Sequence, residues 1–152
     1  MGSPERQKLP RSESARPLTV LHVEDDVALG ASVAALLRTE GCETFTATDG
    51  ASALAWLARP HSDPDVLIVD FHLPGEMDGT DVAEEVHRRL GRVVPTIFVS
   101  GDLSNVALPW LPGAPLLFAA KPVDAGMLVK VVESFGLLGR VMNAQARRAV
   151  AR

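Results

Sequence analysis

Carboxylates and one ammonium group follow three apolar runs of the sequence. Glu24 and Asp25 follow the first run, Asp70 follows the second, and Lys121 follows the third. If each run is a strand of one parallel sheet, the four groups meet at the carboxyl edge of that sheet, where ligands bind. Carboxylates that crowd together repel and raise each other's pKa, and a hard cation such as Mg²⁺, which prefers oxygen ligands, would relieve that repulsion. The spacing therefore predicts a metal-assisted site for a phosphoryl group.

Each of these residues suits a particular part of phosphoryl chemistry. Asp70 follows the most apolar run, so we expect it at the floor of the pocket as a nucleophile that forms an aspartyl phosphate. Glu24 and Asp25 would hold Mg²⁺, directly or through water. The hydroxyl of Ser100, which ends a further apolar run, and the Lys121 ammonium would each bind a phosphoryl oxygen, where charge accumulates during transfer.

Hydrophobic periodicity predicts five strands that alternate with helices. The strands are expected at residues 18–23, 43–48, 66–69, 96–100 and 116–120, and the helices at residues 27–40, 49–58, 79–90 and 123–135. Such an alternation indicates an α/β fold with a doubly wound parallel sheet, because each crossover between parallel strands is helical and right-handed. Between residues 102 and 115, Pro109 and Pro112 remove backbone donors and break helical turns. We therefore expect the fourth helix to be shortened or irregular, with two turns at most.

The two ends of the chain differ from its middle. Residues 1–17 carry three prolines among polar and charged residues, a composition that predicts a flexible tail. Residues 18–136 form the one domain that a chain of 152 residues is expected to contain. Residues 137–152 have helical propensity and are interpreted as a C-terminal helical extension, either a separate helix or a continuation of the preceding one.

Composition narrows the class of partner and the compartment. The formal net charge of −4 leaves no domain-wide basic field, which argues against direct contact with nucleic acid. No apolar run reaches the roughly 18 residues that span a bilayer, and the N-terminus lacks the apolar core of a secretory signal. The single cysteine, Cys42, excludes an internal disulfide framework and suits a reducing compartment. We therefore expect a cytoplasmic location and no membrane partner.

Histidine and tryptophan give weaker signals. His22 lies within a predicted strand and is interpreted as a packed core residue, whereas His61 and His87 are expected at the surface. No spacing among the histidines indicates a metal site. Trp56 and Trp110 are expected to pack in the core and in a loop, respectively. The arginines near the C-terminus form either a solvated face or a contact with a kinase or a second copy of the chain.

The complete set of residues resembles the receiver domain of two-component response regulators. That family carries an acidic pair after its first strand, a phosphorylated Asp after the third, Ser or Thr after the fourth and Lys-Pro after the fifth. The corresponding residues here are Glu24 and Asp25, Asp70, Ser100, and Lys121-Pro122. Residues 70–79 also resemble the family's Asp-x-x-Leu-Pro-Gly-Met-Asp-Gly turn, with Glu76 as an additional residue. The resemblance covers about residues 18–136 and implies a flavodoxin-like sheet of order 2-1-3-4-5.

The resemblance also implies a function and further residue roles. Such a domain takes a phosphoryl group from a sensor histidine kinase or a histidine phosphotransfer protein onto Asp70 with Mg²⁺. It then signals to a downstream protein by conformational change. It is not an enzyme acting on other substrates, although it promotes its own phosphorylation and dephosphorylation. By position, Ser100 and Phe118 would form the switch, the backbone carbonyl of His72 would ligate Mg²⁺, and the His72 and Asp102 side chains would tune the reaction.

Other functions remain open at this stage. A pseudo-receiver would keep the fold as an interaction module that works without phosphorylation. A hydrolase with an aspartyl-phosphate intermediate fits poorly, because His72 stands where such enzymes need a second acid. A flavin-binding role also fits poorly, since no phosphate-cradling Ser/Thr/Gly loop follows the first strand. The sequence identifies neither kinase nor effector. It allows a homodimer, and it allows either a stand-alone receiver or part of a hybrid kinase.

Overall fold

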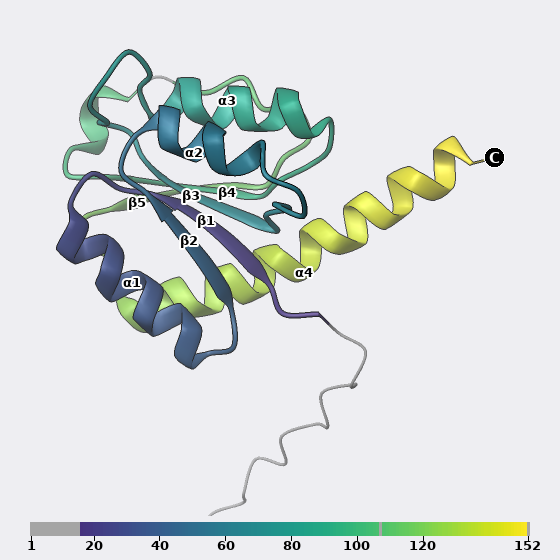
Figure 1. Cartoon of the computed structure of the whole chain (residues 1–152), viewed down its shortest axis with the longest axis horizontal. Coiled ribbons are helices and arrows are strands. Elements are labelled where there is room, and N and C mark those ends of the chain that lie inside the picture. Colours follow the sequence, from purple (N-terminus) through teal and green to yellow (C-terminus); the bar gives the residue numbers. More distant parts are fainter. Residues whose placement is uncertain (1–15, 107, 152) are drawn as a thin grey trace, which may run out of the picture.

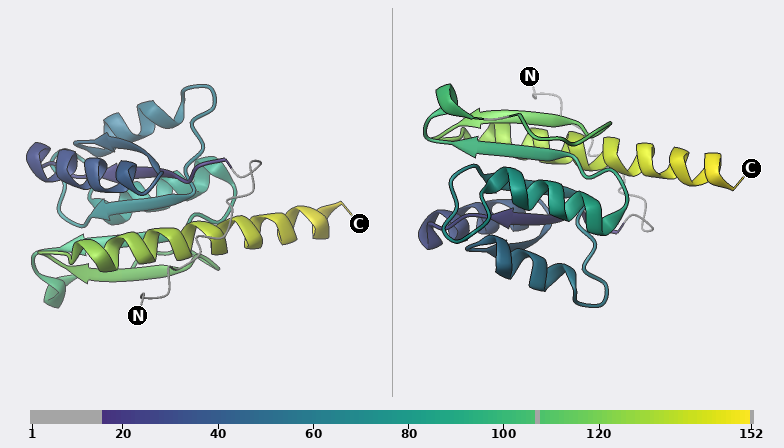
Figure 2. Two further views of the ribbon diagram at one scale, coloured as in Figure 1. Left: turned by 90° about the horizontal axis from the view of Figure 1, so that it is seen from below. Right: turned by 90° about the horizontal axis from the view of Figure 1, so that it is seen from above.

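A computed structural model describes residues 16–106 and 108–151 and shows a sheet between two layers of helices (Figures 1 and 2). Helices α2 and α3 cover one face of the sheet, and α1 and α4 cover the other (Figure 1). The strands are β1 (Thr19–Val23), β2 (Glu43–Ala47), β3 (Val66–Asp70), β4 (Thr96–Ser100) and β5 (Leu116–Ala120). The helices are α1 (Val27–Thr39), α2 (Gly50–Leu57), α3 (Gly79–Leu90) and α4 (Ala125–Val150), with a short 3₁₀ helix, η1 (Leu103–Asn105).

All the strands are parallel, and their order is β2-β1-β3-β4-β5. The predicted flavodoxin-like fold class and strand order are therefore confirmed. Every residue of β3 and β4 is buried, because helices cover both faces of these central strands. This burial explains why both strands read as continuous apolar runs rather than as an alternation of apolar and polar residues.

Two hydrophobic clusters hold the helices against the sheet. On the α2–α3 face, Leu67, Phe98 and Val86 are fully buried. On the α1–α4 face, Val20, Leu37 and other apolar side chains form the second cluster. Apolar burial of this kind contributes about 25 cal/mol per Å² and is the main term that stabilises the layers.

Aspartates fix where the helices begin. The side chains of Asp26, Asp49, Asp78 and Asp124 each accept a hydrogen bond from a backbone amide in the first turn of α1, α2, α3 and α4. An N-cap of this kind satisfies amides that have no partner within the helix. In α2 and α3 the cap is reciprocal, because the third helical residue also binds the backbone of the capping residue.

The connection between β4 and β5 has little helix among its described residues. Only η1 is helical there, and the backbone around Pro109 and Pro112 is irregular. Proline removes an amide donor and clashes with the preceding turn, so a longer helix would be broken twice. The predicted shortening of the fourth helix is confirmed.

Helix α4 is a single helix of 26 residues, so the C-terminal segment continues the preceding helix. Two glycines let it lie close to the residues that precede β1 and β4. A Cβ at Gly136 would fall 2.5 Å from Leu18, and a Cβ at Gly139 would fall 2.8 Å from Pro95. Beyond this contact, α4 projects past the edge of the sheet (Figures 1 and 2).

Polar contacts also fasten α4 to the body of the domain. The Arg140 guanidinium donates to the carbonyls of Arg16 and Pro17, each at 2.9 Å, and to the nearly buried carboxylate of Asp65 at 3.0 and 3.1 Å. Residues 1–15, which make up most of the predicted N-terminal tail, lie outside the described residues.

Within residues 16–106 and 108–151, no helix is long and apolar enough to cross a membrane.

Two predictions about single residues are wrong. The ring nitrogens of His87 lie 2.8 Å from the carbonyl of Ala83 and 2.7 Å from that of Val94, so this histidine joins α3 to the start of β4 instead of facing solvent. Trp110 is 79% exposed and does not pack in its loop, because its proline-rich segment runs along the surface. His22 is buried as predicted.

Candidate functional site

Three carboxylates meet at the carboxyl edge of the sheet. β1 and β3 are neighbours, so the residues that end them lie side by side. Glu24, Asp25 and Asp70 each offer an oxygen, and these oxygens lie within 4.8 Å of one another. Glu24 and Asp70 are buried, whereas Asp25 faces solvent. The solvent-accessible carboxylate of Asp25 therefore lies beside the buried carboxylates of Glu24 and Asp70.

Lys121 forms ion pairs with both buried carboxylates. Its Nζ lies 2.6 Å from Asp70 Oδ2 and 3.0 Å from Glu24 Oε2, so β5 reaches across β4 to both β3 and β1. Burial raises the pKa of Glu24, and the bond from Lys121 offsets part of that shift. For Lys121, burial acts to lower the pKa, but its hydrogen bonds with Asp70 and Glu24 outweigh burial and raise it. The ammonium therefore stays charged at neutral pH.

The other oxygen of Asp70 is held by the loop that follows β3. The backbone amide of His72 donates to Asp70 Oδ1 at 2.9 Å. Gly79 closes this loop, since its amide donates to the Phe71 carbonyl at 3.0 Å. The Asp70 carboxylate is thus fixed from both sides before any reaction.

Gly79 packs against the candidate site, and the sequence interpretation missed its steric role. A Cβ there would lie 2.1 Å from the Asp70 carbonyl oxygen, a distance that backbone atoms do not tolerate. The available signal was the glycine that ends the Asp70–Gly79 motif. The steric reason for a glycine at this position depends on the packing of the start of α3 against the end of β3.

Ser100 is buried at the end of β4, and its hydroxyl is engaged within its own loop. The Ser100 Oγ donates to the Asp102 carbonyl at 2.9 Å and accepts from the Asp102 amide at 3.1 Å. The Asp102 side chain in turn accepts from the amide and hydroxyl of Ser104, which lowers the pKa of Asp102. Ser100 therefore has to exchange a local hydrogen bond before it can serve a ligand at Asp70.

Phe118 lies in an aromatic stack behind this edge. Its ring centroid is 5.4 Å from that of Phe98 and 5.8 Å from that of Phe71, with interplanar angles of 13° in both cases. Phe71 directly follows Asp70, and Phe98 lies two residues before Ser100. The stack therefore connects β5 with the backbone of both expected phosphoryl-binding residues.

His22 lies below the carboxylates on the α1 side of the sheet. It is 4% exposed, and its Nδ1 has no hydrogen-bond partner among the described residues. The pKa of His22 is lowered to about 4, mainly by burial and also by the nearby charge of Lys121, while Asp70 acts in the opposite direction. The ring is therefore neutral at physiological pH.

The donor set fits a hard divalent cation. Carboxylate oxygens are the ligands that Mg²⁺ prefers, and an accessible carboxylate leaves room for the waters that Mg²⁺ retains. Lys121 supplies a fixed positive charge that a transferring phosphoryl group requires. The site thus brings together carboxylates and a fixed ammonium, the groups that metal-assisted phosphoryl chemistry requires.

Comparisons with known proteins agree with this chemistry. A family model described as "Response regulator receiver domain" matches residues 20–133. The Response regulator PleD of Caulobacter vibrioides is 34% identical over 137 residues, which is 89% of this chain and 29% of that protein. The Sensory transduction protein RegX3 of Mycolicibacterium smegmatis is 42% identical over 88 residues, covering 58% of this chain and 36% of that protein. The chain thus spans well under half the length of these curated relatives.

Solved structures show the same fold. A putative response regulator from Chloroflexus aurantiacus superposes with a TM-score of 0.68 at 30% identity, covering 80% of this chain and 99% of that one. The receiver domain from the Hybrid Histidine Kinase CckA gives a TM-score of 0.64 at 31% identity, covering 77% of this chain and 97% of that one.

Proposed function

This chain belongs to the response regulator receiver domain family, and from that premise we propose that Asp70 accepts a phosphoryl group from a phosphohistidine of a partner protein. The observation that carries the proposal is the Lys121 bridge. One ammonium lies 2.6 Å from the Asp70 carboxylate and 3.0 Å from that of Glu24, at the edge where oxygens of Asp25 also converge. Lys121 can exchange its carboxylate contact for an oxygen of an incoming phosphoryl group.

The transfer step needs few changes at the site. A carboxylate oxygen of Asp70 attacks phosphorus, and the bond from phosphorus to the donor imidazole nitrogen breaks. The bonding electron pair stays on that imidazole, which then takes up a proton. The amide of His72 keeps its hold on one Asp70 oxygen while the other oxygen forms the new bond. Aligned attack of this kind gains its rate from positioning and charge stabilisation.

Mg²⁺ is the cofactor that the proposal requires. Glu24, Asp25 and Asp70 would hold it, and the backbone carbonyl of His72 is the further ligand expected from the family resemblance. When bound, the ion would neutralise the charge that develops on the phosphoryl oxygens. Asp25 is the accessible member of the set, so it is the residue whose loss should affect the ion most selectively.

The signal is proposed to pass from Ser100 to Phe118. Phosphorylation draws the Ser100 hydroxyl away from Asp102 toward the new phosphoryl oxygens. The aromatic stack of Phe71, Phe98 and Phe118 then repacks, because it is continuous with both ends of the site. Phe118 lacks a hydroxyl, so it can act on a partner only by a change in shape and not by a hydrogen bond. The side chains of His72 and Asp102, at the mouth of the site, would set how readily water reaches the phosphoryl group.

The complete set of charged groups favours this function over a phosphorylation-independent pseudo-receiver. A sensor kinase or phosphotransfer protein is the proposed donor, and a downstream protein is the proposed recipient of the signal. We also propose that the chain acts in the cytoplasm and that its chemistry is confined to its own phosphorylation and dephosphorylation.

Incubation with phosphoramidate and Mg²⁺, followed by intact-mass spectrometry, tests the proposal. The wild type should gain a single phosphoryl group, and Asp70→Asn should gain none. Asp124→Asn is the matched control, because it makes the same chemical change at a helix N-cap where Asn also serves. An unmodified wild type, or equal modification of Asp70→Asn, would refute the assignment.

A further inference from the structure

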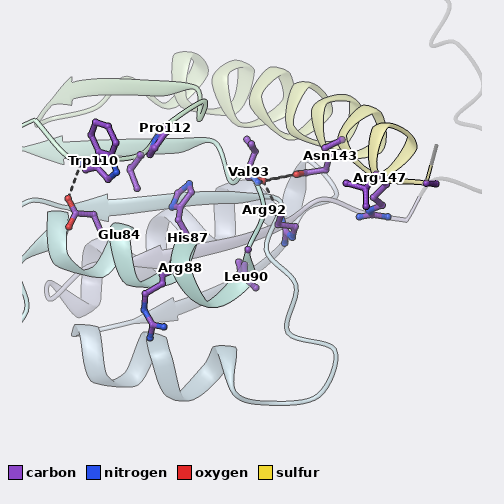
Figure 3. A pocket seen from close by; sticks show the side chains of 15 residues that line it. Glu84, His87, Arg88, Leu90, Arg92, Val93, Trp110, Pro112, Asn143 and Arg147 are labelled. Carbon is purple, nitrogen blue, oxygen red and sulfur yellow. Dashed lines mark hydrogen bonds between the residues drawn. The ribbon is translucent and has the colours of Figure 1, made fainter.

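A second concave feature lies away from the phosphoacceptor edge. It is a groove of about 1040 Å³, hereafter the α3–α4 groove, between the C-terminal half of α3, the loop at residues 110–112 and the last turns of α4 (Figure 3). Its lining includes Leu90 and Val93, which lie near the edge where the strands begin. The groove is thus separate from Asp70 and Lys121.

Hydrogen bonds fix each wall of this groove in place. The Asn143 side chain accepts from the Val93 amide at 3.1 Å and donates to the Val93 carbonyl at 2.8 Å, which fixes α4 against the segment before β4. On the opposite wall, the Trp110 amide donates to Glu84 at 2.9 Å, which fixes the loop against α3 (Figure 3). The groove is therefore formed in the isolated chain and need not be opened by a ligand.

Large apolar side chains stand exposed along the groove. Trp110 is 79% exposed on one wall and Val150 is 87% exposed on the other, Pro112 is also exposed, and the buried Leu111 contributes to the lining from below. Exposed apolar patches beside polar residues often mark interaction surfaces, and Trp is enriched among residues that dominate binding energy. These side chains offer a partner an anchor that is already in place.

Basic side chains outnumber acidic ones in the lining of the groove. Arg88, Arg92 and Arg147 line the groove together with a single acid, Glu84. Arg88 binds Glu85 and Arg92 binds Asp63, but Arg147 has no carboxylate partner among the described residues. Although the whole chain carries a formal charge of −4, Arg147 therefore offers the groove a positive charge that is available to a partner.

We propose that the α3–α4 groove docks an acidic segment of a partner protein that carries apolar side chains. The apolar side chains would rest on Trp110, Pro112 and Val150, and a carboxylate would pair with Arg147. The chain's own residues 1–15 are a poor occupant, since they contain more basic than acidic residues. The inference is independent of the proposed phosphoryl transfer, because it involves no residue of that site.

Selection of a displayed library of random peptides on the immobilised full chain tests the groove. Enriched peptides would be synthesised with a fluorescent label and titrated by anisotropy. They should contain acidic and large apolar residues, and their affinity should fall about tenfold or more for Arg147→Glu and for Trp110→Ser. Binding should also weaken as salt rises, because the charge contact is exposed.

Two variants provide matched controls. Arg148→Glu makes the same charge change on the same turn of α4, but Arg148 does not line the groove. Leu108→Ser removes an equally exposed apolar side chain that also lies outside the lining. Both should bind the selected peptides as the wild type does. Phosphoryl uptake from phosphoramidate should be unchanged in all four variants, which separates a failure here from a failure of the proposed function.

Several results would overturn the proposal. These are a failure to enrich any peptide, enrichment of peptides without acidic residues, and equal affinity of the groove variants and the wild type. Sedimentation provides a further check on the occupant. A dimer of the wild type that dissociates in Arg147→Glu but persists in Arg148→Glu would assign the groove to a second copy of the chain instead.

Discussion

Gly79 packs directly against the backbone of Asp70, at a distance where a Cβ would lie 2.1 Å from the Asp70 carbonyl oxygen. The first residue of α3 thus supports the strand end that carries Asp70, the proposed nucleophile. Because the obstructing atoms belong to the backbone, they cannot move aside as a flexible side chain would. The loop that orients Asp70 therefore depends on the absence of a side chain at this position.

Gly79→Ala should destabilise the domain by about 3 kcal/mol, near the upper end of the usual cost of overpacking. It should also slow phosphoryl uptake, because Asp70 and the His72 amide would shift together. Denaturant unfolding and intact-mass kinetics measure the two effects. Gly126→Ala is the control, since a Cβ there makes only an ordinary contact at 3.5 Å. Equal stability of the two variants would contradict the packing argument.

Asp25→Asn should abolish most of the stabilisation by Mg²⁺ while leaving the metal-free protein almost unchanged. Asp25 is exposed, so its charge contributes little to folding, yet its oxygens converge with those of Glu24 and Asp70. Melting temperatures with Mg²⁺ and with EDTA give the ligand contribution. Asp26→Asn is the neighbouring control, because Asn also caps α1. A response to Mg²⁺ equal to that of the wild type would exclude Asp25 from the cation site.

Lys121→Met should destabilise the metal-free protein by about 2 kcal/mol, because removing one partner leaves buried carboxylates uncompensated. The expected loss is below the full cost for a buried pair, since Lys121 is partly exposed. Mg²⁺ should raise the melting temperature of this variant more than that of the wild type by replacing the lost positive charge. Lys130→Met, on the exposed surface of α4, is the control. A smaller Mg²⁺ effect in Lys121→Met would argue against charge compensation.

The buried His22 should make the metal-free protein less stable in mild acid. Burial, aided by Lys121, lowers the pKa of His22 to about 4, against about 6.5 in an unfolded chain. The unfolded state therefore binds more protons between these values, so the contribution is complete above pH 6.5 and is lost as the pH falls toward 4. The loss amounts to about 3 kcal/mol at most.

Unfolding in EDTA across this pH range measures the effect. His22→Gln should flatten the dependence of the unfolding free energy on pH. Burying the Gln amide also lowers stability, but by the same amount at every pH, so it does not affect this slope. His61→Asn is the control, because His61 is exposed at a positive φ of 66° that Asn tolerates. A slope unchanged in His22→Gln would remove His22 as the cause.

Arg140→Met should destabilise the domain by about 2 kcal/mol, because it leaves the carboxylate of Asp65 with fewer partners and releases the Arg16 and Pro17 carbonyls. Hydrogen exchange should increase in the last turns of α4. Arg148→Met, on an exposed part of the same helix, should change neither quantity. The same loss in both variants would show that Arg140 does not anchor α4 to the body of the domain.

The sequence by itself predicted the fold and the residues of the site. Strands such as Val66–Asp70 are short and apolar up to their last residue, helices begin at capping aspartates, and both signals are local in the chain. The parallel topology then brings Asp70 to the same edge as Glu24 and Lys121, whatever the details of packing. Local pattern and topology together were therefore sufficient for the expected constellation.

Only the tertiary structure decided how these residues are held. Contacts between distant segments place Gly79 under Asp70, bury His22 beside Lys121, and turn His87 inward to the Val94 carbonyl. Such contacts also hold α4 against the residues that precede β1 and β4, and they leave Trp110 exposed on the α3–α4 groove. Periodicity reports which side of an element is apolar, but steric fit, burial and charge depend on neighbours that are remote in the chain.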